Sequence, residues 1–291
     1  MPLYNDKRHV AEALNSLVSG ATAPAEIIVV DNASTDGSVA AIEALEIPVR
    51  IICNVENVGA TRARHQAVGD ASQPFIFFID SDDWISPDAL EAAHAASEKN
   101  DSDIALLRLL RVSGNGGETL FTLEGPVEPI TGIDALKLTL GSWRIHTIGL
   151  YRRDLYHRAS AKFDFHGFSD DEFLSRTILA EARNVVGCDG TYFYRQNPKA
   201  YNFAKIVGQT TTNLRSTALA AERFGADFEG TRAMRDVVVR NLLGLRWRTL
   251  RGEGTRGDVA RLASELRALA IPFGAANSQA ALQSLALRLL A

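Results

Sequence analysis

The sequence has few cysteines and no long apolar run, and these absences exclude several classes of protein. Cys53 and Cys188 are the only cysteines, they have no metal-ligand spacing, and we expect both to be reduced thiols. No stretch of about eighteen uninterrupted apolar residues exists, so we expect no transmembrane helix. The first residues, beginning Met1-Pro2, show no secretory signal, which favours a cytoplasmic protein.

The charge is divided unequally along the chain. The 291 residues are 46% hydrophobic, which is enough for a large core in a main domain with an extension. Residues 201–291 have a net charge of +6, whereas the first 200 residues have a net charge of −10. Such an asymmetry of charge bears on which partners the protein binds and not on which fold it adopts.

Short apolar runs alternate with helical patterns over the first hundred residues. Residues 27–30 and 75–79 are uninterrupted apolar runs of the length of a buried strand. Apolar side chains recur at helical spacing over residues 10–19. Further predicted elements are a strand at 49–52 and helices at 39–45 and 61–69. This alternation predicts an α/β fold, with a mostly parallel central sheet flanked by helices.

Three acids follow the apolar run of residues 75–79, at Asp80, Asp82 and Asp83. Carboxylates at the C-terminal end of a strand lie where open α/β sheets bind ligands. Three acids within four residues repel one another unless a cation joins them, and Mg²⁺ or Mn²⁺ with oxygen ligands is the simplest candidate. The alternative is a capped turn in which these residues begin a helix near Pro87.

Several short motifs follow one another over the first 200 residues. They are residues 2–5, residues 30–37, the Asn57-x-Gly59 turn with Ala63-Arg64-His65, residues 80–84, residues 168–176 and a closing strand at residues 192–198. In this order they resemble family 2 glycosyltransferases of the GT-A fold. The resemblance implies a catalytic domain at residues 1–200, with a nucleotide-sugar half (about 1–100) and an acceptor half (about 101–200). It also implies inverting transfer of a sugar from a nucleotide donor, with UDP the commonest carrier in the family.

The resemblance assigns the donor site to residues of these motifs. Asp31 and Asn32 are expected to hydrogen-bond the base, and Pro2 and Tyr4 to wall its pocket. Family members often have Asp where Asn32 stands, and this difference bears on base preference. Arg64 is expected to offset phosphate charge; otherwise it is a surface arginine of a helix. The remaining donor-site assignments are Asn5, Asn57, Asp80 and Ser81.

By the same resemblance, Asp82 binds the metal ion, Mn²⁺ or Mg²⁺, while Asp80 contacts the donor ribose and shares the metal. A metal that bridges the pyrophosphate oxygens neutralises the charge of the leaving group. Asp83 is expected to be a capping or supporting acid. Family members often carry a histidine ligand late in the domain. No histidine follows Tyr194 here, so we expect water or the pyrophosphate to complete the coordination.

A general base is needed to take the proton from the acceptor hydroxyl, and a carboxylate is the usual choice. Residues 168–176 resemble the ED-x-E-F-x-x-R segment that holds this base in the family. Alignment on Arg176 makes Asp170 the base, whereas alignment on the acid pair makes it Asp171. The structural alternative is that these acids only begin a helix, since acids are favoured near its positive end.

The segment from about residue 100 to 161 is expected to face the acceptor. Residues 104–110 predict a buried strand and residues 114–117 a turn of a hairpin. Trp143 is expected to stack on a sugar ring, or else to be a core tryptophan. Glu172 is assigned to acceptor binding, and His146 is a poorer candidate for the base than the carboxylates.

The basic C-terminal extension, residues 201–291, predicts helices with two apolar stripes. The first stripe is Met234, Val238, Leu242 and Leu245, and the second is Val239, Leu243, Trp247 and Leu250. The second stripe is flanked by Arg232, Arg235, Arg240, Arg246 and Arg251. An arginine-edged apolar face with a tryptophan suits an anionic membrane surface. The alternatives are a dimer interface or burial between two helices. A break is expected at residues 252–255, followed by helices at 256–270 and 278–290.

These observations predict a metal-dependent inverting glycosyltransferase of surface polysaccharide synthesis, which uses a nucleotide sugar and a glycan or lipid-linked acceptor. We expect it on the cytoplasmic side, peripheral to the inner face of the membrane. The alternative is a non-catalytic nucleotide-sugar or polysaccharide-binding module. A nucleotidyltransferase is disfavoured because residues 2–6 contain no glycine, and nucleic acid binding because aromatic side chains are not interleaved with the basic ones. Family members have an apolar strand before residues 2–5, so we expect the natural protein to extend upstream of Met1.

Overall fold

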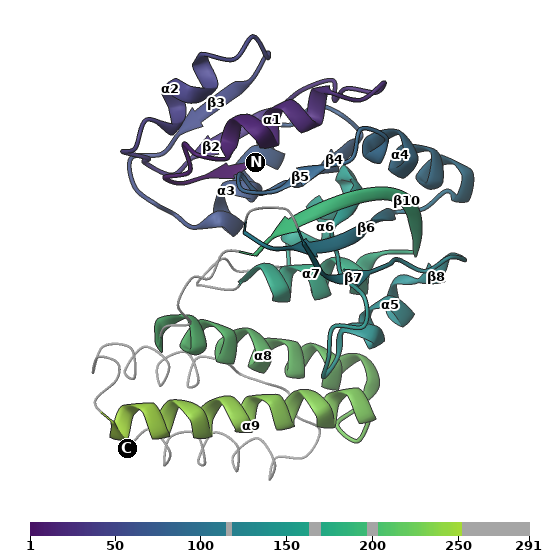
Figure 1. The fold of residues 1–291 in the computed structure, drawn as a ribbon. Coiled ribbons are helices and arrows are strands. Elements are labelled where there is room, and N and C mark those ends of the chain that lie inside the picture. The colour runs from purple at the N-terminus through teal and green to yellow at the C-terminus, as the bar shows by residue number, and fades with distance from the viewer. Residues whose placement is uncertain (115–117, 163–169, 197–202, 252–291) are drawn as a thin grey trace. The chain divides into compact units, whose positions relative to one another are not determined.

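The computed structural model describes residues 1–114, 118–162, 170–196 and 203–251 (Figure 1). The chain separates into two compact units. Unit 1 comprises Met1–Ala135, Arg144–Phe165 and Ile178–Pro198, and unit 2 comprises Leu136–Trp143, His166–Thr177 and Lys199–Ala291. A domain boundary at residue 200 stays a prediction.

Strands and helices alternate over residues 2–77, as the apolar pattern predicts. The strands are β1 Pro2–Leu3, β2 Ile28–Asp31, β3 Arg50–Cys53, β4 Phe75–Phe77, β5 Trp84–Ile85, β6 Ile104–Val112, β7 Thr119–Leu123, β8 Ile130–Thr131, β9 Gly149–Arg152 and β10 Asn184–Arg195. The helices are α1 Val10–Val18, α2 Ser38–Glu43, α3 Ala60–Asp70, α4 Ala89–Asn100, α5 Gly132–Thr139, α6 Arg153–Ser160, α7 Asp170–Glu181, α8 Phe203–Phe224 and α9 Glu229–Leu250.

The first three strands form a parallel sheet in unit 1, in the order β1-β2-β3. Leu3 lies opposite Asp31, and Asp31 lies opposite Cys53, so the carboxyl ends of all three strands meet at one edge. Helix α3 packs against β1 and β2. This arrangement confirms the predicted strands at residues 27–30 and 49–52, each shifted by one residue.

The second sheet of unit 1 is mixed, with the order β4-β9-β6-β10-β5 and with β7 and β8 beside β6 and β10. Strands β6 and β10 are parallel, and α4 packs against both. Strand β4 is three residues long, shorter than the predicted 75–79, and pairs with β9 in the antiparallel direction. The predicted hairpin is present as the antiparallel pair β6 and β7, while its turn at residues 115–117 lies outside the described residues.

One hydrophobic cluster joins the two sheets of unit 1. Leu3, Leu14 and Val29 from the first sheet and its helix pack with Ala105 and Leu107 of β6, and each is 1% exposed or less. Fully burying side chains of this size stabilises the fold by roughly 1.5–3 kcal/mol for each Leu or Val. The cluster therefore fixes the strand ends that carry the candidate site.

The long helices α8 and α9 pack together in unit 2 (Figure 1). Gly225, with a φ of 88°, ends α8, and its N–H donates to the Ala221 carbonyl at 2.9 Å. A left-handed glycine is a usual way to end a helix because it carries no Cβ. The first predicted stripe is buried, with Met234, Val238, Leu242 and Leu245 at 1% exposure or less.

The second predicted stripe is partly exposed on α9. Leu243 is 50% exposed and Trp247 is 58% exposed, and the guanidinium of Arg251 lies 4.2 Å from the centroid of the Trp247 ring. The side chains of Arg246 and Leu250, the predicted break at 252–255 and the predicted helices at 256–270 and 278–290 lie outside the described residues. Among the helices that are described, none is long and apolar enough to cross a membrane.

Candidate functional site

The loops that follow β1 and β2 are joined by Asn5. Its backbone N–H donates to Ser34 Oγ at 2.9 Å, and its side-chain oxygen accepts from the Thr35 N–H at 2.8 Å. Asn5 has a φ of 50°, in the left-handed region that asparagine tolerates better than most residues. Asn5, which we expected at the donor site, thus shapes the loop through its side-chain oxygen.

Asp31 and Asn32 are buried at the carboxyl end of β2, at 4% and 2% exposure. The Asp31 carboxylate accepts from the Ser34 N–H at 3.2 Å, which closes a tight turn after the strand. The Asn32 side-chain oxygen accepts from Asn54 Nδ2 at 2.9 Å. Both polar groups are therefore held rigidly at the strand end where we expected the base of the donor.

Pro2 and Tyr4 differ in accessibility. Pro2 lies in β1 and is buried, whereas Tyr4 is 51% exposed just beyond the strand. An exposed aromatic ring can stack on a planar base, so the place of Tyr4 and Pro2 in the wall of a base pocket stays a prediction.

The turn of residues 80–83 lies between β4 and β5 in unit 1. Its ends are joined by the Asp83 N–H, which donates to the Asp80 carbonyl at 3.2 Å. The Asp80 carboxylate pairs with the guanidinium of Arg64 on α3, and Ser81 Oγ donates to Asp6 Oδ2 at 2.7 Å. The structure thus brings together four of the predicted donor-site or metal residues: Arg64, Asp80, Ser81 and Asp82.

Asp83 is set apart from its neighbours by burial. It is 2% exposed, and its two oxygens accept from the Tyr192 hydroxyl at 2.6 Å and from the Arg195 N–H at 2.8 Å. Burial, together with the nearby Asp80 charge, raises the pKa of Asp83 to about 8. Asp83 is thus a structural acid of the turn.

Asp80 and Asp82 have the chemistry required for a hard divalent cation. The Asp80 side chain is 36% exposed and Asp82 is half-buried. Within the described residues no cluster of three or more metal-ligating side chains exists. Two carboxylates nevertheless fit Mg²⁺ or Mn²⁺, since these ions commonly take one or two carboxylates and complete their shell with phosphate oxygens and water.

Asn57 acts at the start of α3. Its side-chain oxygen accepts from the Gly59 N–H at 2.9 Å, and Gly59 has a φ of 85° as the chain enters the helix. Arg64 follows one turn later on the same helix. Asn57 therefore positions the helix that carries Arg64, and its predicted contact with the donor stays a prediction.

An apolar cavity of about 340 Å³ lies elsewhere in unit 1. It is lined by residues of β2, α3 and β4, among them Ile28, Val68 and Ile76. Neither Asp80 nor Asp82 lines it. The cavity is therefore not the candidate donor site.

Asp170 and Asp171 begin α7 in unit 2. Asp170 is 5% exposed and accepts from Arg215 on α8 at 3.4 Å, whereas Asp171 is exposed. A carboxylate at a helix N-terminus is favoured by the positive end of the helix dipole. The earlier residues of this motif, 168 and 169, lie outside the described residues.

Arg176 is the centre of a buried polar cluster in unit 2. It is 2% exposed, lies 3.5 Å from the Glu172 carboxylate and donates to Ser216 Oγ at 2.9 Å. Its guanidinium also lies 4.4 Å from the centroid of the Trp143 ring, a cation–π geometry. One face of Trp143 is therefore occupied by Arg176. Burial raises the pKa of Glu172.

Sequence reasoning assigned no role to four residues that organise these sites. They are Asp6, Tyr192, Arg195 and Arg215. Tyr192 and Arg195 belong to the closing-strand motif, and an arginine at the end of a predicted strand is the sequence signal that marks Arg195. Asp6 and Arg215 are polar residues whose partners are distant in sequence, so no local pattern marks them.

A comparison with protein families places this geometry in context. Residues 1–159, more than half of the chain, match the model of glycosyl transferase family 2. The chain belongs to glycosyl transferase family 2. The match includes Asp31, Arg64, Asp80 and Asp82, and the family suggested by the sequence motifs is confirmed.

Several curated members of family 2 are similar to this chain. The poly(ribitol-phosphate) β-N-acetylglucosaminyltransferase TarS of Staphylococcus aureus strain Mu50 is 27% identical over 201 residues, which cover 67% of this chain and 34% of TarS. The poly(ribitol-phosphate) β-glucosyltransferase of Bacillus spizizenii is 30% identical over 205 residues, covering 67% and 31%. The chain thus spans about a third of the length of these relatives.

Two solved structures share the fold of this chain. Residues 1–349 of S. aureus TarS, in complex with UDP-GlcNAc, align with a TM-score of 0.65 and 19% identity, over 93% of this chain and 80% of that chain. The mannosyltransferase PcManGT of Pyrobaculum calidifontis, in complex with GDP-Man and Mn²⁺, aligns with a TM-score of 0.56 and 16% identity, over 99% and 78%. The expected GT-A fold with a helical C-terminal part is confirmed.

Proposed function

We propose that this chain is a metal-dependent inverting glycosyltransferase that moves a sugar from a UDP-sugar to a glycan or lipid-linked acceptor of a surface polysaccharide. The observation that carries the proposal is the pair Asp80 and Asp82 at the end of a strand, with Arg64 beside Asp80. Membership of glycosyl transferase family 2 supports it. UDP-N-acetylglucosamine and UDP-glucose are the donors to test first, since the similar proteins named above transfer N-acetylglucosamine or glucose.

In this proposal the residues of unit 1 hold the donor. Asp31 and Asn32 bind the base and Tyr4 covers it, while Asp80 contacts the ribose. Asp82, with Asp80, would hold Mn²⁺ or Mg²⁺, and the cation would neutralise the charge that develops on the diphosphate of the departing UDP. Arg64 adds a second positive charge, and its guanidinium pairs with both Asp80 and the phosphates.

A carboxylate of α7 acts as the general base. Asp170, or Asp171 in the alternative alignment, accepts the proton of the acceptor hydroxyl as its oxygen bonds to the anomeric carbon. The bond from that carbon to the diphosphate oxygen breaks on the opposite face, so the anomeric configuration inverts. Trp143 and Glu172 contact the acceptor sugar.

The exposed stripe of α9 is the proposed contact with an anionic membrane at the cytoplasmic face, and a homodimer is the alternative. Leu243 and Trp247 supply exposed apolar area, and the arginines that flank the stripe supply charge. Co-sedimentation with phosphatidylserine vesicles separates membrane binding from dimerisation. Neutral vesicles and a Trp247→Glu variant are the controls.

Release of UDP from UDP-N-acetylglucosamine and UDP-glucose, with Mn²⁺ and with poly(ribitol phosphate) as acceptor, tests the proposed activity. We expect turnover that Asp82→Asn and Asp170→Asn abolish and that Asp189→Asn, a change of a 99% exposed side chain, leaves intact. Turnover that survives both site substitutions contradicts the proposal. Nucleotide binding without turnover of any donor indicates the non-catalytic binding module instead.

A further inference from the structure

Arg195, the last residue of β10, is a buried arginine in which each of the three side-chain nitrogens donates a hydrogen bond. It is 7% exposed. Its Nε donates to the Asp82 carbonyl at 2.8 Å, and its two terminal nitrogens donate to the Gly114 carbonyl at 3.1 Å and to Glu12 Oε2 at 2.7 Å. Its guanidinium lies 4.4 Å from the centroid of the Trp84 ring. Arg195 therefore links α1, the turn of residues 80–83 and the end of β6.

Burying a guanidinium is costly unless its donors are satisfied, and the rigid fork of arginine meets this requirement where lysine does not. Three contacts of Arg195 fall on residues 82–84. Its side chain contacts the Asp82 carbonyl and the Trp84 ring, and its backbone N–H donates to the Asp83 carboxylate. Through its Nε, the side chain therefore holds the backbone carbonyl of Asp82.

Tyr192, three residues earlier on the same strand, holds the other end of the turn. Its hydroxyl accepts from the Asp80 N–H at 3.2 Å and donates to Asp83 Oδ2 at 2.6 Å. Strand β10 thus fixes the backbone of Asp80 and of Asp82 from one side. These are the two residues whose carboxylates fit a divalent cation.

We propose that Arg195 is a positioning residue for the cation-binding turn: it holds the Asp82 backbone so that the carboxylates of Asp80 and Asp82 converge on Mn²⁺ and a nucleoside diphosphate. This inference rests on the proposed function of the turn. Groups that orient metal ligands without touching the metal change metal affinity by roughly 10–100-fold when they are replaced.

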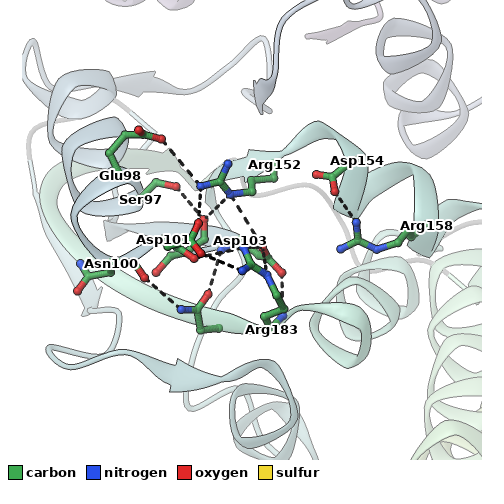
Figure 2. Close-up of polar contacts among 11 residues, drawn as sticks. Ser97, Glu98, Asn100, Asp101, Asp103, Arg152, Asp154, Arg158 and Arg183 are labelled. Carbon is green, nitrogen blue, oxygen red and sulfur yellow. Dashed lines mark hydrogen bonds and ion pairs between the residues drawn. The ribbon is translucent and has the colours of Figure 1, made fainter.

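Arg152 provides a matched control in the same unit. Its Nε donates to the Ser102 carbonyl at 3.2 Å, its terminal nitrogen donates to Asp101 Oδ1 at 3.0 Å, and its guanidinium lies 5.1 Å from the centroid of the Phe75 ring. Figure 2 shows Arg152 near Glu98 of α4 and near Asp101 and Asp103, which lie between α4 and β6; none of these acids belongs to the candidate site. Arg152→Lys therefore removes the same kinds of contact as Arg195→Lys, but at a position outside the candidate site.

The experiment measures UDP binding by titration calorimetry, with and without Mn²⁺, for the wild type, Arg195→Lys and Arg152→Lys. Thermal melts first establish a temperature at which all three proteins are folded. We expect Arg195→Lys to weaken Mn²⁺-dependent UDP binding by roughly 10–100-fold while metal-free binding changes little, and Arg152→Lys to change only the melting temperature. Glu12→Ala, which removes a half-exposed partner of Arg195, is expected to cause a smaller loss of the same kind.

The outcomes separate this inference from the proposed function. A folded Arg195→Lys protein that binds Mn²⁺ and UDP as the wild type does overturns the positioning role. An equal loss of affinity in Arg152→Lys also overturns it, since the effect is then one of general stability. A wild type with no Mn²⁺-dependent UDP binding instead contradicts the proposed function, and the role of Arg195 with it.

Discussion

Tyr192 donates its phenol hydrogen to the Asp83 carboxylate across 2.6 Å, and both residues are 2% exposed. The two residues are 109 positions apart in the sequence, so this bond ties the turn after β4 to the last strand of unit 1.

Tyr192→Phe is expected to lower the free energy of unfolding by about 1–3 kcal/mol, because it leaves the Asp83 oxygen and the Asp80 N–H without this partner. Chemical denaturation measures the change. Tyr194→Phe is the control, since Tyr194 is 37% exposed on the same strand. Equal stability of Tyr192→Phe and the wild type would show that the bond contributes nothing to the fold.

Asp170→Asn and Asp171→Asn are expected to differ in their effect on turnover. Asp170 is buried and held by Arg215, as a positioned base must be, whereas Asp171 is exposed. We expect Asp170→Asn to lower kcat by roughly 10²–10⁴-fold and Asp171→Asn to lower it far less. UDP affinity should be unchanged in both. A larger loss of kcat in Asp171→Asn would assign the base to Asp171.

Acidification is expected to destabilise the fold through His146. Its side chain is 6% exposed, its Nδ1 accepts from the Ile148 N–H at 3.0 Å, and burial lowers its pKa to about 4. The unfolded chain binds a proton at this residue below about pH 6.5, whereas the folded chain does so only below about pH 4. The contribution of neutral His146 to the free energy of unfolding is therefore complete above pH 6.5. It is lost as the pH falls to 4, and the loss is on the order of 3 kcal/mol.

His146→Asn keeps an acceptor near the position of Nδ1 and removes the titration. Unfolding free energies measured between pH 7 and pH 4 should fall less steeply in this variant than in the wild type. His94→Asn, a change of an exposed side chain, controls for the general effect of losing a histidine. Parallel pH curves for wild type and His146→Asn would refute the assignment.

Arg176→Met is expected to destabilise unit 2 by roughly 3–5 kcal/mol, because it leaves Glu172 and Thr139 without their buried cation. The matched control is Arg158→Met, which breaks an exposed pair with Asp154 (Figure 2). A surface pair of this kind contributes at most about 1 kcal/mol. Denaturation curves that change equally in the two variants would show that the Arg176 cluster is not a stabilising core.

Local patterns in the sequence were enough to predict the first half of unit 1. An apolar run such as residues 27–30 has the length and composition of a buried strand, and the helical spacing of residues 10–19 defines α1. The acid cluster at Asp80 and the glycine-containing turn before Arg64 are also local, so candidate donor-site residues could be proposed from them.

The remaining features depend on contacts that no local pattern encodes. Asp82 and Asp83 are neighbours of the same type, and only burial against Tyr192 and Arg195 separates their roles. The antiparallel pairing of β4 with β9 likewise depends on where the chain returns after α5. Asn5 was expected to contact the donor, but its φ of 50° and its bond to Thr35 became visible only in the folded loop.

The central claim is that Asp80 and Asp82 bind a divalent cation together with a nucleoside diphosphate. Titration calorimetry of UDP, GDP and dTDP, each with and without Mn²⁺, on the wild type and on Asp82→Ala tests it most directly. We expect Mn²⁺-dependent binding of UDP that Asp82→Ala abolishes. Binding of no nucleotide to the folded wild type, or UDP binding that is indifferent to Mn²⁺ and to Asp82→Ala, would contradict it.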